Sequence, residues 1–311
     1  MVRPSRPLRP AMTLIELLVV ISIIAALTGL LLGGVMRVMG QRRVTETAAR
    51  MAAINNAINT FKSSAAFGQV RYIPAGRPLP GGGWGPFRLR NSYPPRDADG
   101  NVVSSQPDEN SFEAQYLQQV FGGGSRLNFA DLGYPGLSGD LDANQTLTFF
   151  LTGIPEPDVQ GNAIFTGFST HPQQPFKRRA SPSEKRRGPL LDLGGSRKYR
   201  IEGGFARLID GYNKHSDGFG LPFAYFTAVD GKANFNYGGY NEPNVYNLPN
   251  VLTLLPPYGV NGQFENPSGF QLISAGKDGV FGRSGNWRAV DSDGQDDQAN
   301  FSTALLGRGP Q

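Results

Sequence analysis

The stretch Leu17–Met36, LLVVISIIAALTGLLLGGVM, decides how this sequence is interpreted, because none of its residues carries a charge. An α-helix rises about 1.5 Å per residue, so this stretch would cover roughly 30 Å, the thickness of the hydrocarbon core of a bilayer. Arg3, Arg6 and Arg9 precede it, and basic residues on this side favour a cytoplasmic N-terminus. The stretch therefore predicts one membrane-spanning helix, with the rest of the chain on the other side of the membrane.

Glu16 lies directly before this stretch and argues against a plain secretory signal or a simple anchor. A charged side chain costs on the order of 3 kcal/mol at the centre of a membrane helix and less near its end, and such acids usually have a partner. Two interpretations remain open from the residues alone. Glu16 either reaches the lipid headgroups, or it pairs with a positive group of another molecule.

The residues from Ala11 to Ile21, AMTLIELLVVI, together with the basic leader resemble the N-terminal signal of type IV prepilins and pseudopilins. The resemblance implies that a prepilin peptidase removes residues 1–11 by cutting between Ala11 and Met12, and that it methylates the new N-terminus. The family usually has Gly before the cut and Phe after it, and this chain departs from both. Glu16 becomes the fifth mature residue, where the family has its glutamate.

The resemblance also implies the function and the partners. The chain is expected to be a structural subunit of a type IV pilus-like or type II secretion pseudopilus filament, and not an enzyme. It would wait in the bacterial cytoplasmic (inner) membrane as a single-pass protein with an extracytoplasmic C-terminal domain, and then join an extracytoplasmic filament. Expected partners are other copies of itself, related pilins, the prepilin peptidase, membrane lipid and an inner-membrane assembly platform with its ATPase.

In such a filament, Glu16 of one subunit would meet the α-amino group that cleavage creates at Met12 of a neighbour. Each buried charge would then offset the desolvation of the other, whereas an unpaired one is heavily penalised. The pairing would set the axial register between subunits.

Small residues recur at four-residue spacing along the same helix, at Ala25, Gly29 and Gly33. This spacing lets two helices approach closely, so we interpret the three positions as part of an assembly surface. The alternative is a chance run, because Gly and Ala are common in membrane helices.

The apolar periodicity continues beyond the uncharged stretch. Apolar residues recur at steps of four and three, as on one face of an amphipathic helix; they are Val44, Ala48, Met51, Ile54, Ile58 and Phe61. No proline occurs between Met12 and Ile73. These features predict one helix over residues 12–64, whose first half spans the membrane and whose second half packs on a sheet.

The remaining chain is predicted to be rich in loops and to end in a small sheet. The sequence has 41 Gly and 24 Pro, and residues 65–200 are interpreted as a long Gly/Pro-rich insertion. Two short helices are expected within it, at Ser111–Phe121 and at Thr146–Leu151, the second with Asp142 as its N-cap.

Residues 201–311 are predicted to form an antiparallel β-meander with an acidic C-terminal loop. Its expected strands are Phe205–Asp210, Leu221–Val229 and Phe270–Ser274. The predicted fold class is therefore α+β, with a long N-terminal helix packed on a small antiparallel sheet.

Two segments of this region show a weaker resemblance to the major pseudopilin of type II secretion. The stretch DGFGLPFAY from Asp217 to Tyr225 is similar to its DPWGNPYxY element, with Phe219 and Leu221 in place of Trp and Asn. Ile273 to Gly279, ISAGKDG, resembles the SxGxDG strand and turn that follow.

Four carboxylates lie within seven residues near the C-terminus, at Asp291, Asp293, Asp296 and Asp297. Clusters of oxygen ligands suit Ca²⁺, and the resemblance implies a calcium-stabilised loop near this position. The alternative is a solvent-exposed acidic turn, because the spacing matches no defined calcium-binding loop.

The residue counts exclude several kinds of site. The chain has no cysteine and two histidines, which excludes thiolate metal sites, cysteine nucleophiles and multi-histidine zinc sites. The basic run Lys177–Arg187, KRRASPSEKRR, could bind a polyanion, but without interleaved aromatic residues it favours a solvated loop. A nucleic-acid partner is therefore not expected. Two alternatives to a structural subunit stay open, namely a signal-anchored extracytoplasmic hydrolase and a minor pilin that acts as an adhesin or DNA-binding module.

Overall fold

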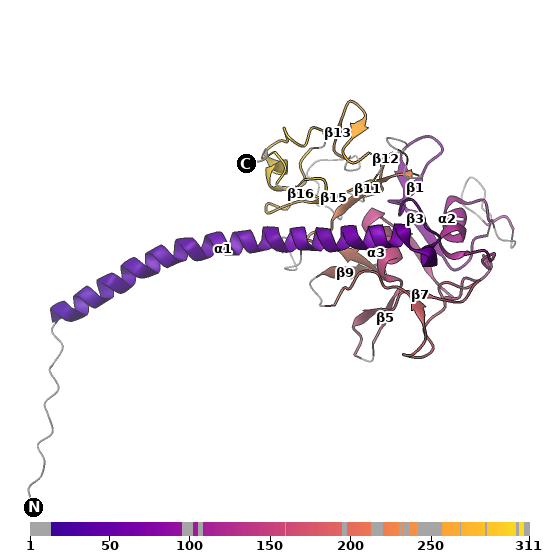
Figure 1. Cartoon of the computed structure of the whole chain (residues 1–311), viewed down its shortest axis with the longest axis horizontal. Helices are drawn as coiled ribbons and strands as arrows, with labels where there is room; N and C mark the ends of the chain where they lie inside the picture. Colours follow the sequence, from indigo (N-terminus) through magenta and orange to yellow (C-terminus); the bar gives the residue numbers. More distant parts are fainter. Residues whose placement is uncertain are drawn as a thin grey trace, which may run out of the picture. The chain divides into compact units, whose positions relative to one another are not determined.

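The computed structural model describes residues 14–94, 102–104, 108–158, 160–194, 198–212, 220–229, 232, 237–241, 257–267, 269–283, 285–302 and 305–307, without the side chains of residues 30–40. The chain divides into two units, Met1–Thr45 and Glu46–Gln311. The first helix belongs to both units, and the other elements belong to the second (Figure 1).

The described residues form three α-helices, two short 3₁₀ helices and sixteen strands. The helical elements are α1 (Leu14–Ser63), η1 (Ala65–Phe67), α2 (Phe112–Phe121), α3 (Ala143–Thr152) and η3 (Asp293–Asp296). The first eight strands are β1 (Arg77–Pro78), β2 (Trp84–Gly85), β3 (Phe87–Arg90), β4 (Ser138–Leu141), β5 (Pro155–Pro157), β6 (Ala163–Phe165), β7 (Phe168–Ser169) and β8 (Arg186–Arg187). The others are β9 (Tyr199–Glu202), β10 (Phe205–Leu208), β11 (Ala224–Ala228), β12 (Tyr237–Gly238), β13 (Gly259–Val260), β14 (Gln263–Phe264), β15 (Phe270–Ser274) and β16 (Gln298–Ala299).

The predicted membrane span is wrong. Helix α1 has 50 residues, but no helix in the described part of the chain has both the length and the apolar content that crossing a membrane requires. Single-pass anchoring in the inner membrane is therefore not supported.

The predicted packing of this helix on a sheet is also wrong. Phe61 of α1 is fully buried, and its ring stacks on Phe67 of η1 at 4.7 Å and meets Phe150 of α3 edge-on at 5.8 Å. The buried side of α1 thus packs into an aromatic cluster of helical residues. Helix α3, rather than α1, lies against strands β10 and β11.

The predicted meander is replaced by several small antiparallel sheets. Within the described residues there is one four-stranded sheet, in the order β12-β11-β15-β16, and every other sheet has two strands. Strand β10 pairs with β9, and an isolated antiparallel bridge between Ile209 and Pro222 connects its end to the segment before β11. The reason for the pairing of β10 with β9 is local, because Gly203 and Gly204 have φ angles of 59° and 83°, and two positive φ angles make a tight hairpin turn between neighbouring strands.

The four-stranded sheet is buried on both faces, which explains why its strands do not alternate between apolar and polar residues. Successive side chains of a strand point to opposite faces. Tyr225 and Leu272 therefore join the larger hydrophobic cluster, which includes the aromatic rings around Phe61. Phe226 and Ile273 join a second, smaller cluster on the other face.

The two predicted short helices are confirmed. Helix α2 begins after Ser111, whose hydroxyl accepts a hydrogen bond from the backbone N–H of Ala114. Helix α3 begins after Asp142, whose carboxylate accepts from the backbone N–H of Gln145, while the Gln145 side chain accepts from the backbone N–H of Asp142. This reciprocal capping box satisfies two N–H groups that a helix start otherwise leaves without partners.

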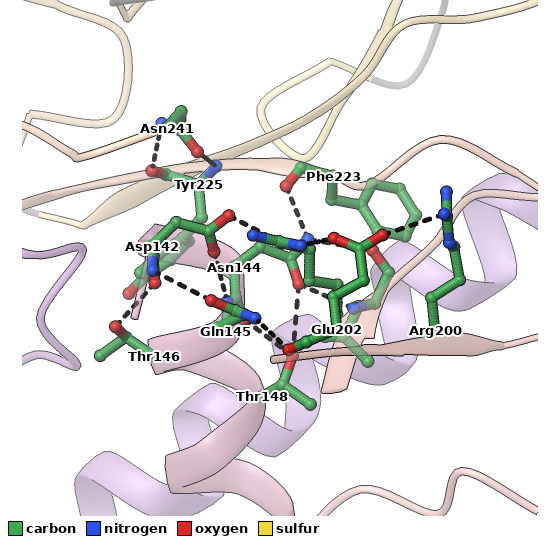
Figure 2. A network of polar contacts seen from close by, with 12 residues as sticks. Asp142, Asn144, Gln145, Thr146, Thr148, Arg200, Glu202, Phe223, Tyr225 and Asn241 are labelled. Atoms are coloured by element: carbon green, nitrogen blue, oxygen red, sulfur yellow. Dashed lines mark hydrogen bonds and ion pairs between the residues drawn. The ribbon is translucent and has the colours of Figure 1, made fainter. Parts of the chain in front are cut away.

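Polar side chains of α3 hold two of the small sheets together. The Asn144 side chain donates to the carbonyls of Leu208 (2.9 Å) and Phe223 (2.7 Å), and its oxygen accepts from the N–H of Leu208 (2.7 Å). Figure 2 shows Asn144 among these groups, at the start of α3. The amide thus reinforces a place where Phe223 N–H already donates to the Leu208 carbonyl, beside the antiparallel bridge between Ile209 and Pro222.

The same network contains a buried ion pair. Arg207 of β10 donates from Nε to Oδ2 of Asp142 at 2.8 Å, and it also pairs with Glu202 of β9. The side chains of Arg207 and Asp142 are only 6% and 1% exposed. Figure 2 shows Asp142 and Glu202 in the network beside the first turn of α3. Because both charges are matched, this network fixes where α3 lies on the β9-β10 hairpin.

Candidate functional site

The large apolar side chains at the start of α1 are exposed. Leu14 is 80% exposed and Ile15 is 70% exposed. Successive helix residues point about 100° apart, so an apolar run of this length covers every side of the helix. We call Leu14–Leu27 the N-terminal apolar segment; its exposed large side chains are Leu14, Ile15, Leu17, Leu18, Val19, Val20, Ile21, Ile23, Ile24 and Leu27.

The hydroxyl groups in and beside this segment are satisfied within the helix. Ser22 donates to the carbonyl of Val19 at 2.8 Å, and Thr28 donates to the carbonyl of Ile24 at 2.6 Å. Neither hydroxyl therefore needs a partner from another molecule, as is usual for Ser and Thr inside helices. What the segment offers to a partner is apolar surface.

Glu16 is the acidic residue in the first turn of α1, and it is exposed. A carboxylate in the first turn is stabilised by the partial positive charge of the helix N-terminus, typically by about 0.3–1 kcal/mol. The interaction with the helix N-terminus explains why an acidic residue stands in the first turn. It does not explain why this acidic residue lies beside a long apolar surface.

The three small residues at four-residue spacing all lie in α1. Ala25 is exposed, and a Cβ built on Gly29 would meet no atom within 4 Å. The chain itself therefore does not need Gly at this position. Gly33 lies in the part of α1 whose side chains are not described, and Ala11 and Met12 lie outside the described residues.

The carboxylates near the C-terminus accept hydrogen bonds from nearby backbone and side-chain groups. Asp296 Oδ2 accepts from the N–H groups of Lys277 (2.5 Å) and Asp278 (2.9 Å). Asp291 Oδ1 accepts from the N–H of Gly294 at 3.1 Å. Asp293 Oδ1 accepts from the Ser292 hydroxyl at 3.2 Å. In the described part of the chain, no three acidic or histidine side chains are grouped to hold a metal ion.

Asp297 lies apart from this exposed turn, because it is fully buried. Its Oδ2 accepts from the Tyr258 hydroxyl at 3.2 Å and from the N–H of Gly282 at 2.9 Å. Burial raises the pKa of Asp297 to about 8, because desolvation penalises the charged form. Burial therefore favours the protonated form of this core carboxyl.

Most of the basic run at residues 177–187 is exposed, as expected for a solvated loop, but the run also makes contacts with the fold. Arg186 and Arg187 form strand β8. Arg187 donates to the carbonyl of Phe121 at 3.2 Å, and the Arg178 guanidinium lies over the Tyr134 ring at 4.2 Å. Several of the charges in the run therefore serve the fold.

Sequence reasoning missed the hydrogen bonds through which Arg50 connects α1 to the rest of its unit. Arg50 donates to the carbonyls of Ile209 (2.8 Å) and Asp210 (2.7 Å) and pairs with Glu46. The only signal in the sequence is the spacing of four between Glu46 and Arg50, which predicts an ion pair on a helix but not the carbonyl partners.

Comparison with known proteins identifies no relative. No protein-family profile, no curated protein and no solved structure matches this chain.

Proposed function

We propose that this chain is a structural subunit of a type IV pilus-like or type II secretion pseudopilus filament, and that its N-terminal apolar segment is the surface through which copies assemble. The observation that carries the proposal is the exposure of the large apolar side chains from Leu14 to Leu27. A helix that is apolar on every side needs a cover, and in the described part of the chain these side chains are exposed.

The free energy that this surface can contribute is of the same order as the cost of association. Covering a large apolar side chain fully contributes about 1.5–3 kcal/mol, so covering the half-exposed side chains of the segment contributes on the order of 10 kcal/mol. The loss of translational and rotational freedom on association costs an estimated 4–15 kcal/mol. In a filament each segment contacts more than one neighbour. The free energy gained by burial is then expected to exceed the cost of association.

The charge at Glu16 supplies the specificity. Its resemblance to the family glutamate leads us to propose that the peptidase cuts between Ala11 and Met12, and that the freed amine of Met12 pairs with Glu16 of a neighbour. Apolar contacts alone allow the helices to slide, whereas a buried carboxylate without a cation is strongly destabilising. The assembly platform and its ATPase would provide the mechanical work.

Mass spectrometry of the native protein tests the processing step. We expect a mature chain that begins with methylated Met12. A native chain that retains residues 1–11, or one that starts beyond Gly34, would contradict the proposal.

Substitution of Glu16 tests the pairing. Glu16→Gln keeps the size of the side chain and removes its charge, so we expect unchanged folding and at least a tenfold loss of filament, measured by sedimentation and electron microscopy. Glu16→Asp keeps the charge and should retain part of the assembly. Filaments from Glu16→Gln in wild-type amounts would rule out the pairing.

A further inference from the structure

An apolar groove lies beside α1 in the second unit. It has a volume of about 260 Å³, and its walls come from α1, from the segment before β9 and from β10. Ala49 and Ala53 form the α1 side of the groove and are exposed. The other walls include side chains that are buried and apolar, namely Ile54, Leu191, Leu193 and Leu208.

The charges at the groove are already used, which argues against a charged ligand. Both terminal guanidinium nitrogens of Arg50 have partners. Nη1 donates to the carbonyls of Ile209 and Asp210, and Nη2 donates to the carboxylate of Glu46. Lys198 donates to the backbone carbonyl of Asp192 at 3.5 Å. The remaining surface is apolar, so its occupant should be apolar too.

The volume indicates the size of the occupant. A dry apolar cavity of about 150 Å³ can hold benzene, so a groove of about 260 Å³ holds one or two large aliphatic side chains. The small side chains of Ala49 and Ala53 are four residues apart on one side of α1. A second helix can therefore lie close to α1 and place a side chain into the groove.

We infer that this groove receives a large aliphatic side chain from the segment Leu17–Leu27 of another copy of the chain. Among its described residues, the same polypeptide presents an exposed uncharged surface and an apolar groove. The two surfaces match in chemistry and in size. This inference rests on the proposed function, and it assigns the packed half of α1 a role in contacts between subunits.

Disulfide cross-linking of the full chain tests the contact directly, because the native sequence has no cysteine. Ala53→Cys is combined with one further cysteine, placed in turn at each position from Leu17 to Leu27. We expect cross-linked multimers after mild oxidation of assembled protein, with yields that peak every three to four positions along the helix. The matched control is Ala52→Cys, since Ala52 is exposed on the same helix but is not part of the groove. Equal yields from Ala52→Cys and Ala53→Cys, or no cross-link from either, would overturn the inference.

Filling the groove separates this inference from the proposed function. Ala53→Trp should leave the melting temperature of the unassembled chain within a few degrees of the wild type and reduce assembly at least tenfold. Ala52→Trp should assemble normally. If the wild type forms no filaments, the proposed function fails. If filaments form and Ala53→Trp assembles like the wild type, the groove is not a contact and the proposed function stands.

Discussion

The two ends of α1 form one continuous helix but differ in what covers their apolar side chains. In the packed half, Glu46–Ser63, Met51 and Phe61 are buried by the aromatic core of their own unit. In the N-terminal apolar segment, Leu18 is 54% exposed and its neighbours are similar. The comparison shows that sequence periodicity decides which kind of cover a helix needs. The amphipathic stretch buries its apolar face within its own unit, whereas the described side chains of the stretch that is apolar on every side are exposed.

The largest expected effect compares one core residue with one exposed residue of the same helix. Phe61→Ala removes a ring that contacts Phe67 and Phe150, and it should lower the free energy of unfolding by about 3–5 kcal/mol. Leu18→Ala should change it by no more than about 0.5 kcal/mol. Urea denaturation of the unassembled chain measures both. Equal losses at the two positions would break the comparison.

The second prediction concerns how the free energy of unfolding depends on pH through the buried carboxyl of Asp210. The backbone carbonyl of this residue accepts a hydrogen bond from Arg50 of α1. Burial raises the pKa of Asp210, although Ser274 and the N–H groups of Tyr212 and Leu221 donate to its carboxylate and the charge of Arg50 acts in the opposite direction. The folded state therefore holds a proton that the unfolded state releases, so stability is highest below the ordinary aspartate range and falls as the pH rises through the raised pKa.

The slope of this loss can reach about 1.4 kcal/mol per pH unit for one group. Asp210→Asn should make the dependence of the unfolding free energy on pH shallower. It should not abolish the dependence, because burial also raises the pKa of Glu113 and of Asp297. An unchanged slope in Asp210→Asn would show that this carboxyl is not the titrating group.

The third prediction compares two arginines on α1. Arg50 is bonded to two backbone carbonyls of its unit, and hydrogen bonds from charged groups contribute about 1.5–3 kcal/mol. Arg50→Met should therefore lose about that amount in denaturation experiments. Arg42 is exposed on the same helix, and Arg42→Met should be neutral within about 0.5 kcal/mol. A neutral Arg50→Met would mean that this tie does not hold α1 in place.

The smallest expected effect compares two threonines that lie two positions apart. The Thr47 hydroxyl accepts a hydrogen bond from the buried N–H of Gly211 at 3.0 Å, whereas the exposed Thr45 hydroxyl donates to the carbonyl of Gln41 within its own helix. Thr47→Val leaves that N–H without a partner and should lose about 1 kcal/mol. Thr45→Val should have no measurable effect on the free energy of unfolding. A loss as large as that of Thr47→Val would contradict the distinction between the exposed and the packed parts of α1.

The sequence predicts the local structure of this chain better than its tertiary structure. The helix start at Asp142 and the strand Phe270–Ser274 agree with the structure, because capping groups and runs of branched and aromatic residues act locally. The predicted meander does not include the pairing of β10 with β9, which depends on the positive φ angles of the Gly203-Gly204 turn. The bridging role of Asn144 depends on carbonyls more than sixty residues away, which no local pattern encodes.

The candidate site shows the same limit. The apolar, uncharged stretch and Glu16 are visible in the sequence, and their role in assembly stays a prediction. The groove beside Ala53 could not be predicted, because its walls come from residues about 140 positions apart. The acidic run looked like one cluster, yet Asp297 is buried and Asp296 binds backbone N–H groups of the turn after β15.

The most direct test is the reactivity of a single thiol at Ile24, in the N-terminal apolar segment. Ile24→Cys, in a chain without other cysteines, is treated with a maleimide before and after assembly, with Ala52→Cys as the control. We predict at least a tenfold slower reaction at position 24 in the assembled protein, and less than a twofold change at position 52. Equal rates at position 24 in both states would show that other copies do not cover this surface, and that would contradict the account.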